Sequence, residues 1–373
     1  MRAGAALADM QAMLATLRAH FEAAGCAPIE PAHLFPAEAL LDVYGEDVRA
    51  RAFLFPDPVT GGELCLRPDF TMPVALAHGR AGWEAPGRYT YQGAVFRRQD
   101  TGSTRPVEYL QAGIEEFGGA DPAAADAQVF ATIYQGLEAV GAPPREVATG
   151  DLGIVFALLD ALDMPEQRRA ELRRHVWRPA RFHALLEEFC APEPPSESRR
   201  ALIQAVQDGT VSALAAQAGE PVGQRTLAEI EARAASLAEA ADMPPLPPEQ
   251  AELIEAVLAI KDNSGNALAR IHSLTSQGGA DITRALDRFE RRLDALNQTG
   301  FDAEDLPFDA AFGRNLEYYN GFVFEMRAEG APDLPPLAGG GRYDAITARL
   351  GAARAVPAVG GMIRPEAVWE AKR

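Results

Sequence analysis

The sequence is poor in cysteine and has no pattern that would bring its cysteines together. Its 373 residues include three cysteines, Cys26, Cys65 and Cys190, which lie far apart. It contains no CxxC motif and no Cys/His cluster, which argues against a disulfide framework and against a zinc site. Unpaired cysteines are typical of a reducing compartment, so we expect a cytoplasmic location.

Basic residues are also scarce relative to acidic ones. Lys and Arg total 35 and Asp and Glu total 53, which gives a formal net charge of −18. Affinity for nucleic acid comes largely from Lys and Arg on phosphate, so we expect no nucleic-acid partner. No apolar run reaches the roughly 20 residues of a membrane span, and Asp9 comes too early for a signal peptide, so no membrane partner is expected either.

Several common catalytic patterns are missing. The six histidines show no metal-ligand spacing, and the chain has neither a GxSxG elbow nor a GxxxxGK[ST] phosphate loop. Residues 339–341 (GGG) lack the spacing of a dinucleotide fingerprint and are interpreted as a turn that precedes a helix. We therefore expect no metal and no cofactor.

The pattern of elements along the chain favours an α+β fold. Hydrophobic residues make up 47% and charged residues 24%, as in ordinary globular proteins. Strands come first, then helices, then strands again, rather than in alternating βαβ units. The periodicities predict helices over 7–21, 72–78, 121–141 and 280–298, and strands over 52–56, 63–66, 88–97, 107–117, 146–150, 308–313, 321–327 and 355–363.

The middle of the chain differs in composition. Helical patterns rich in Ala, Glu and Arg dominate, and two proline-rich segments, 191–196 and 243–249, interrupt them as connections between helices. We expect a mostly helical insertion over 151–279 in a core made of 1–150 and 280–373.

The strand over 107–117 carries a polar face. Because side chains alternate along a strand, Gln111, Gly113 and Glu115 share one face. The glycine between two polar side chains leaves a gap where a small ligand could lie against the backbone. A solvent-exposed polar strand face is the common alternative.

Charged residues elsewhere would complete a site for a zwitterion. Asp69 and Thr71 could bind an ammonium group, and the planar fork of Arg97 suits a carboxylate. A second cluster begins at Arg314 and continues with Tyr318 and Tyr319, whose rings could wall a pocket, although such tyrosine pairs are more often structural.

Taken together, these segments resemble histidyl-tRNA synthetase, a class II aminoacyl-tRNA synthetase. The resemblance covers the chain from about residue 10 to its end, is weakest over 151–300, and implies a six-stranded antiparallel sheet flanked by helices, a dimer formed through the N-terminal region, and a histidine pocket. It is carried by the strings LRPDFT (66–71), RYTYQGAVFRRQDTGSTRPVEYLQAGIEEFG (88–118), GRNLEYYNGFVFE (313–325), LAGGGRYD (337–344) and VPAVGG (356–361).

The resemblance assigns roles within that pocket. It implies that the ligand ammonium meets Asp69, Thr71 and Gln111, and that Asp69 stands where the family has Glu. It further implies that Arg314 meets the carboxylate beside Arg97 and Gln111, and that Glu115 and Tyr319 bracket the imidazole. The complete expected histidine-binding set is Asp69, Thr71, Arg97, Gln111, Glu115, Arg314, Tyr318 and Tyr319.

The departures from the synthetase pattern fall at its ATP site. Ala367 takes the place of an arginine that holds the ATP phosphates, and Arg364 lies three positions early. Gln99 replaces a glutamate, whereas Arg97 and Arg105 are kept where the family contacts ATP. Because phosphoryl chemistry depends on positioned cations, the resemblance implies a degenerate ATP site at Gln99, Arg105 and Ala367. The chain stops at Arg373, so no anticodon-binding domain is expected.

A synthetase-like core of this kind is similar to a paralogous family, the regulatory subunits of ATP phosphoribosyltransferase. This likeness implies a non-catalytic chain that pairs with a short-form catalytic subunit, forms a homodimer within a hetero-oligomer, and confers feedback inhibition by histidine on the first step of histidine biosynthesis. Two alternatives stay open. One is an adenylate-forming enzyme, either a truncated synthetase or a ligase that charges another acceptor, and the other is a folding scaffold with a vestigial pocket.

Overall fold

The computed structural model describes residues 3–40, 51–99, 102–103, 106–192, 194–217, 226–313 and 318–373. The chain divides into two compact units, one of Met1–Leu158 with Ala256–Arg373 and the other of Leu159–Glu255. The expected insertion was 151–279. The structure places β8 (Lys261–Asn263) and α12 (Ser264–Gln277) in the first unit, because β8 pairs with β9 of the main sheet and α12 packs on both strands.

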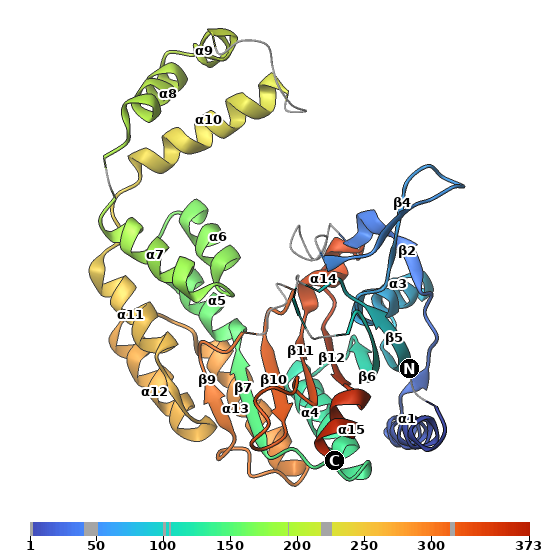
Figure 1. Cartoon of the computed structure of the whole chain (residues 1–373). Coiled ribbons are helices and arrows are strands. Elements are labelled where there is room, and N and C mark those ends of the chain that lie inside the picture. The colour runs from blue at the N-terminus through green and yellow to red at the C-terminus, as the bar shows by residue number, and fades with distance from the viewer. Residues whose placement is uncertain are drawn as a thin grey trace. The chain divides into compact units, whose positions relative to one another are not determined.

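Within the described residues, the first unit contains a nine-stranded sheet of order β1-β5-β6-β12-β11-β10-β7-β9-β8 (Figure 1). The run from β5 to β7 is six strands paired antiparallel, and β1 and β9 add to its two ends as parallel neighbours. The expected α+β fold is confirmed. Besides β8, the strands are β1 (Ala27–Pro28), β5 (Gly87–Phe96), β6 (Glu108–Phe117), β7 (Glu146–Asp151), β9 (Pro307–Asp309), β10 (Phe322–Arg327), β11 (Ala338–Arg342) and β12 (Ala358–Ile363).

The glycine run 339–341 is a strand, and its interpretation as a turn was wrong. It forms most of β11, which is buried throughout between β10 and β12. A Cβ on Gly340 would lie 2.2 Å from the Gly360 carbonyl oxygen and 2.7 Å from the Phe324 ring. Glycine is required here because neighbouring backbone and an aromatic ring occupy the space that a side chain would need. The interpretation as a turn took glycine only as a turn former and did not consider this close packing.

Helices cover one face of this sheet. The central one, α4 (Pro122–Ala139), begins at Asp121, whose carboxylate accepts hydrogen bonds from the Ala123 and Ala124 N–H groups. It packs on β6, β10, β11 and β12 and on two further helices, α1 (Ala5–Ala23) and α13 (Thr283–Gln298). Two short helices, α14 (Asp344–Arg349) and α15 (Pro365–Ala371), flank β12.

A smaller sheet, followed by a helix, comes before the antiparallel hairpin of β5 and β6 in the sequence. Strands β2 (Leu34–Pro36), β4 (Glu63–Leu66) and β3 (Leu54–Pro56) pair antiparallel in that order. The chain leaves β4 and enters α3 (Thr71–Ala81) through Arg67, whose buried guanidinium donates to the carbonyl oxygens of Ala94 and Pro31. This anchor fixes the segment that carries Asp69 and Thr71 against β5.

The second unit is helical. A buried arginine, Arg168, lies over the Phe189 ring and donates to the Pro244 carbonyl, so it ties three of its segments together. None of the helices in the described part of the chain combines the length and apolarity needed to cross a bilayer. The helices are α6 (Glu166–His175), α7 (Pro179–Cys190), α8 (Glu197–Gln207), α9 (Val211–Gln217) and α10 (Leu227–Asp242), while α5 (Leu152–Ala161) and α11 (Pro248–Leu258) span the two boundaries.

A buried ionic network joins the sheet to its helices in the first unit. Arg342 of β11 donates to Asp126 of α4 at 2.8 Å, and Arg292 of α13 donates to Asp151 at 2.8 Å while lying 3.6 Å from Asp126. Arg342 also donates to Asp344 at 2.8 Å. Both arginine side chains are 1% exposed, so each charge depends on its partners for compensation.

Replacing Arg292 should therefore destabilise the chain strongly. In Arg292→Met, Asp151 and Asp126 lose a cation inside the protein, so the free energy of unfolding in urea should fall by about 3–5 kcal/mol. The matched control is Arg291→Ala. Arg291 lies beside Arg292 on α13 and makes an exposed ion pair with Asp121 at the start of α4, so its loss should cost less than about 1 kcal/mol. Equal, small losses in both variants would contradict the role assigned to the network.

Candidate functional site

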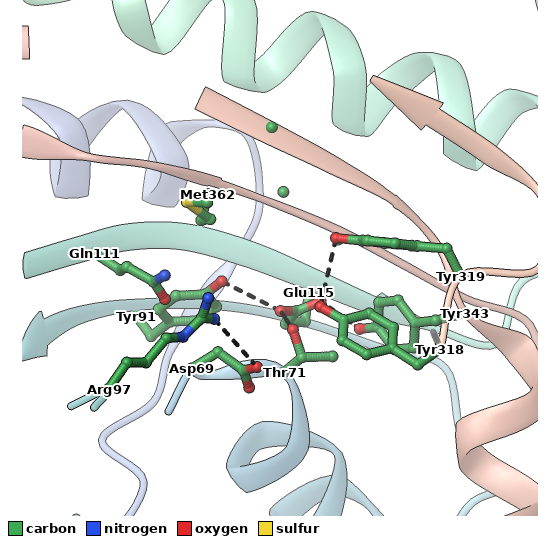
Figure 2. A pocket seen from close by; sticks show the side chains of 13 residues that line it. Asp69, Thr71, Tyr91, Arg97, Gln111, Glu115, Tyr318, Tyr319, Tyr343 and Met362 are labelled. Atoms are coloured by element: carbon green, nitrogen blue, oxygen red, sulfur yellow. Dashed lines mark hydrogen bonds and ion pairs between the residues drawn. The ribbon is translucent and has the colours of Figure 1, made fainter. Parts of the chain in front are cut away.

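A narrow pocket (Figure 2), partly open to solvent and with a cavity volume of about 20 Å³, lies on the face of the sheet opposite α4. Neighbouring residues of β12 show the two faces. A Cβ on Gly361 would meet Ile133 of α4, whereas a Cβ on Gly360 would meet Glu115 in the pocket. Seven of the eight residues expected to bind histidine line the pocket. These are Asp69, Thr71, Arg97, Gln111, Glu115, Tyr318 and Tyr319.

Two sequence-based assignments lie outside the described residues. They are Arg314, expected at the ligand carboxylate, and Arg105, expected at the degenerate ATP site. The structure adds pocket residues that sequence reasoning missed: Tyr91, Gly339, Tyr343, Gly360, Gly361 and Met362. A signal for Tyr91 was available, because in a hairpin with strands over 88–97 and 107–117 this tyrosine pairs directly with Gly113.

The centre of the pocket is the buried carboxyl of Glu115. Thr71 Oγ1 and Tyr91 OH donate to its Oε1 at 3.0 and 3.2 Å, and Tyr343 OH donates to its Oε2. A Cβ on Gly360 would lie 1.6 Å from Oε2, so the carboxyl fits only because this position has no side chain. Three hydroxyls and one glycine thus hold Glu115 in a single position.

The gap at Gly113 does not admit a ligand, and this expectation was wrong. A Cβ on Gly113 would lie 2.6 Å from the Tyr91 hydroxyl and 2.4 Å from the Gly361 carbonyl oxygen. Tyr91, which stacks on Phe70 with ring centroids 4.3 Å apart, occupies that space from the facing strand. The missing side chain therefore makes room for a tyrosine that hydrogen-bonds Glu115.

Opposite charges lie together elsewhere on the pocket wall. Arg97 Nη2 lies 3.7 Å from Asp69 Oδ2, and Arg97 Nε donates to the Pro68 carbonyl at 2.7 Å. The Tyr318 hydroxyl donates to the Tyr319 hydroxyl at 3.4 Å. The pocket thus offers one guanidinium and one carboxylate beside each other, with aromatic walls and a buried carboxyl. Within the described residues, no group of three His, Cys, Asp or Glu side chains could hold a metal ion.

Burial controls protonation in this pocket. It raises the pKa of Glu115 to about 8, an effect that the hydrogen bonds from Tyr343 and Thr71 oppose and the nearby charge of Asp69 reinforces. Burial also raises the pKa values of Tyr91, Tyr318 and Tyr343 well above the ordinary value, so all three remain neutral hydroxyls at physiological pH.

The described residues of the expected ATP site have partners within the chain. Gln99 donates to the Pro106 carbonyl at 3.1 Å, and Ala367 is buried on α15. Arg364, the arginine three positions before Ala367, donates to the Pro336 carbonyl at 2.7 Å. The next acidic residue, Glu366, accepts a hydrogen bond from the Leu110 N–H at 2.9 Å.

Comparisons with known proteins agree with this architecture. The family model for histidyl-tRNA synthetase matches residues 4–244 and 207–368. Two solved structures share the fold. One is an ATP phosphoribosyltransferase regulatory subunit/histidyl-tRNA synthetase from Bacillus halodurans C, with a TM-score of 0.69 and 23% identity over 100% of this chain and 82% of that chain. The other is a histidyl-tRNA synthetase from Nostoc sp. PCC 7120, with a TM-score of 0.63 and 18% identity over 97% of this chain and 70% of that chain.

The fold is therefore that of the histidyl-tRNA-synthetase-like class II aminoacyl-tRNA synthetases. A sequence relative narrows this further. The ATP phosphoribosyltransferase regulatory subunit of Brucella canis is 35% identical over 355 residues, which cover 92% of this chain and 93% of the relative. The chain belongs to the family of ATP phosphoribosyltransferase regulatory subunits.

Replacing Glu115 should change how stability depends on pH. The pKa of Glu115 is higher in the folded chain than in the unfolded chain, so the folded state holds the extra proton. This proton contributes its full stabilisation of the folded chain below the pKa that Glu115 has in the unfolded chain, about 4.3. The stabilisation is lost as pH rises through 8. In Glu115→Gln this loss is absent, and the difference from wild type should grow by up to about 1.4 kcal/mol per pH unit between pH 5 and 8.

Urea unfolding of both chains at pH 5.5, 7, 8 and 9 measures that difference. Glu146→Gln, at an exposed position at the start of β7, is the matched control and should track the wild type across the series. Parallel stability curves for wild type and Glu115→Gln would show that Glu115 is ionised in the folded chain at neutral pH.

Proposed function

We propose that this chain is a non-catalytic regulatory subunit of ATP phosphoribosyltransferase, and that free histidine binds as the feedback effector in the pocket around Glu115. The observation that carries the second part is the pocket itself. The Arg97–Asp69 pair lines the same pocket as the buried carboxyl of Glu115, which accepts hydrogen bonds from surrounding hydroxyls. Family membership supports the first part.

The pocket offers a partner for each polar group of histidine. The ligand ammonium would take Asp69, with Thr71 and Gln111 beside it. The ligand carboxylate would take Arg97 together with Arg314, because a guanidinium binds a carboxylate through two parallel hydrogen bonds. The imidazole would lie between Glu115 and Tyr319, with Tyr318 completing the wall. Aromatic walls and a few fixed polar groups are typical of small-molecule sites.

The region of the expected ATP site supports a role without catalysis. An adenylating site needs cations aimed at the phosphates, yet a buried methyl group stands at Ala367 and the nearby Arg364 binds the Pro336 carbonyl. A carboxylate, Glu366, lies between them in sequence and accepts from the Leu110 N–H. These groups hold strand and loop backbone together.

Regulation then follows from linkage. We propose that the chain forms a homodimer, that the dimer joins a short-form catalytic subunit in the cytoplasm, and that the complex performs the first step of histidine biosynthesis. Histidine inhibits if it binds one state of that complex more tightly than another, and by reciprocity the inhibited state then binds histidine more tightly.

Asp69→Asn tests the sensing role. The amide keeps the shape of Asp69 but removes the charge that meets the ligand ammonium, so the histidine concentration for half-inhibition of the reconstituted complex should rise at least about tenfold. Each variant is compared with its own uninhibited rate. Arg98→Ala, next to Arg97 but exposed, is the matched control and should leave that concentration unchanged. An unaltered response in Asp69→Asn would favour a scaffold with a vestigial pocket.

ATP–pyrophosphate exchange in the presence of histidine separates a sensor from an adenylate-forming enzyme. Arg97, which the synthetase likeness also places at ATP, is the feature that favours the enzyme. We expect no exchange above the background of an Arg97→Ala variant, because positioned cations carry such chemistry and Ala367 supplies none. Robust exchange that disappears in Arg97→Ala would overturn the non-catalytic assignment.

A further inference from the structure

The two oxygens of the Glu115 carboxyl are not equivalent. Oε1 accepts two hydrogen bonds, from Thr71 and Tyr91, whereas Oε2 accepts one, from Tyr343. A carboxyl oxygen offers about two lone-pair positions, so Oε1 is saturated and Oε2 keeps one position for a ligand. Oε2 packs directly on the backbone at Gly360, so its remaining position faces away from β12. A ligand donor or acceptor therefore meets Oε2, next to the Tyr343 hydroxyl.

In the part of the chain that the structure describes, the surroundings of Glu115 supply hydroxyls and no cation in direct contact. The elements packed around it present Thr71 from α3, Tyr91 from β5 and Tyr343 after β11, and within the described residues no ion pair reaches Glu115. Asp69 contributes a second negative charge from the segment before α3, and Arg97 lies 3.7 Å from that carboxylate. Among the described residues, an ionised Glu115 therefore has no opposite charge in direct contact, and a ligand can bring one.

We propose, on the premise that histidine binds in this pocket, that its imidazole ring and the Glu115 carboxyl hold a single proton between them, and that Tyr343 positions the oxygen that shares it. Glu115 enters binding with its proton and histidine with a neutral ring. The proton then lies between Oε2 and the bare ring nitrogen, so no proton is exchanged with solvent near neutral pH. The site thereby selects a ring that can accept this proton.

Proton balance dictates the pH dependence of affinity. Above about pH 8, where burial no longer keeps Glu115 protonated, binding must take one proton from solvent. Below about pH 6.5, free histidine carries an extra ring proton that must be released. Affinity should be highest between these limits and fall by up to tenfold per pH unit on either side.

Calorimetric titration of L-histidine into the full chain, and into its complex with the catalytic subunit, tests this from pH 5.5 to 9. Phosphate and Tris buffers, whose ionisation enthalpies differ, report the number of protons exchanged. For the wild type we expect none near pH 7.2 and an uptake approaching one at pH 9. Glu115→Gln is the matched control for ionisation of the ligand ammonium, and its affinity should lack the part of the alkaline decline that Glu115 causes.

A second pair of variants tests Tyr343. Its hydrogen bond lowers the pKa of Glu115, so Tyr343→Phe should move the alkaline decline to higher pH as well as weaken binding. Tyr318→Phe is the control, because the Tyr318 hydroxyl donates to Tyr319 and not to Glu115, and its decline should begin at the wild-type pH.

The outcomes separate the inference from the function on which it rests. Histidine binding with no proton uptake at pH 9, or with the same alkaline decline in Glu115→Gln, overturns the shared proton and leaves the sensing role standing. A Tyr343→Phe variant that binds more weakly without any shift of the decline overturns the positioning role. No binding at any pH, by the chain or by the complex, removes the sensing role and the inference with it.

Discussion

The pocket depends on one constraint, the burial of a carboxyl group inside a sheet. Glu115 can be buried because β12 passes it with a glycine, and a Cβ at Gly360 would lie 1.6 Å from its oxygen. Hydroxyls from three separate elements then replace the water that the carboxyl loses. Glycines in β11 and β12 also let these two strands approach each other and the Phe324 ring. The core and the site therefore both require glycine in these strands.

Much of the fold was predictable from local patterns. The strands over 88–97 and 107–117, the helix over 121–141 and the strand over 63–66 agree with the structure to within about one or two residues, because side-chain alternation and helical periodicity are local signals. The glycine strand was not predictable in this way. Gly339, Gly340 and Gly341 carry no hydrophobic periodicity, and their place is set by neighbours from β10 and β12 that are distant in sequence.

Sequence reasoning named seven of the residues that line the pocket but not the contacts among them. Strand alternation placed Gln111 and Glu115 on one face, and the family likeness brought Asp69, Arg97 and Tyr319 to them. Neither argument revealed that Tyr91 fills the space beside Gly113 or that Tyr343 donates to Glu115. Such contacts depend on strand register and on which face a tyrosine takes after a strand ends, and both are properties of the assembled sheet.

The position of β12 has a consequence for how the chain reaches its native state. This strand follows every other strand of the large sheet in sequence, yet it lies between β6 and β11 near the middle of the strand order. Until it has been synthesised, the β5–β6 hairpin and the β10–β11 pair expose unpaired edges that are prone to aggregation. Insertion of β12 closes both edges and brings Gly360 to Glu115 in the same event, so a chain with a formed pocket is also one whose sheet is complete.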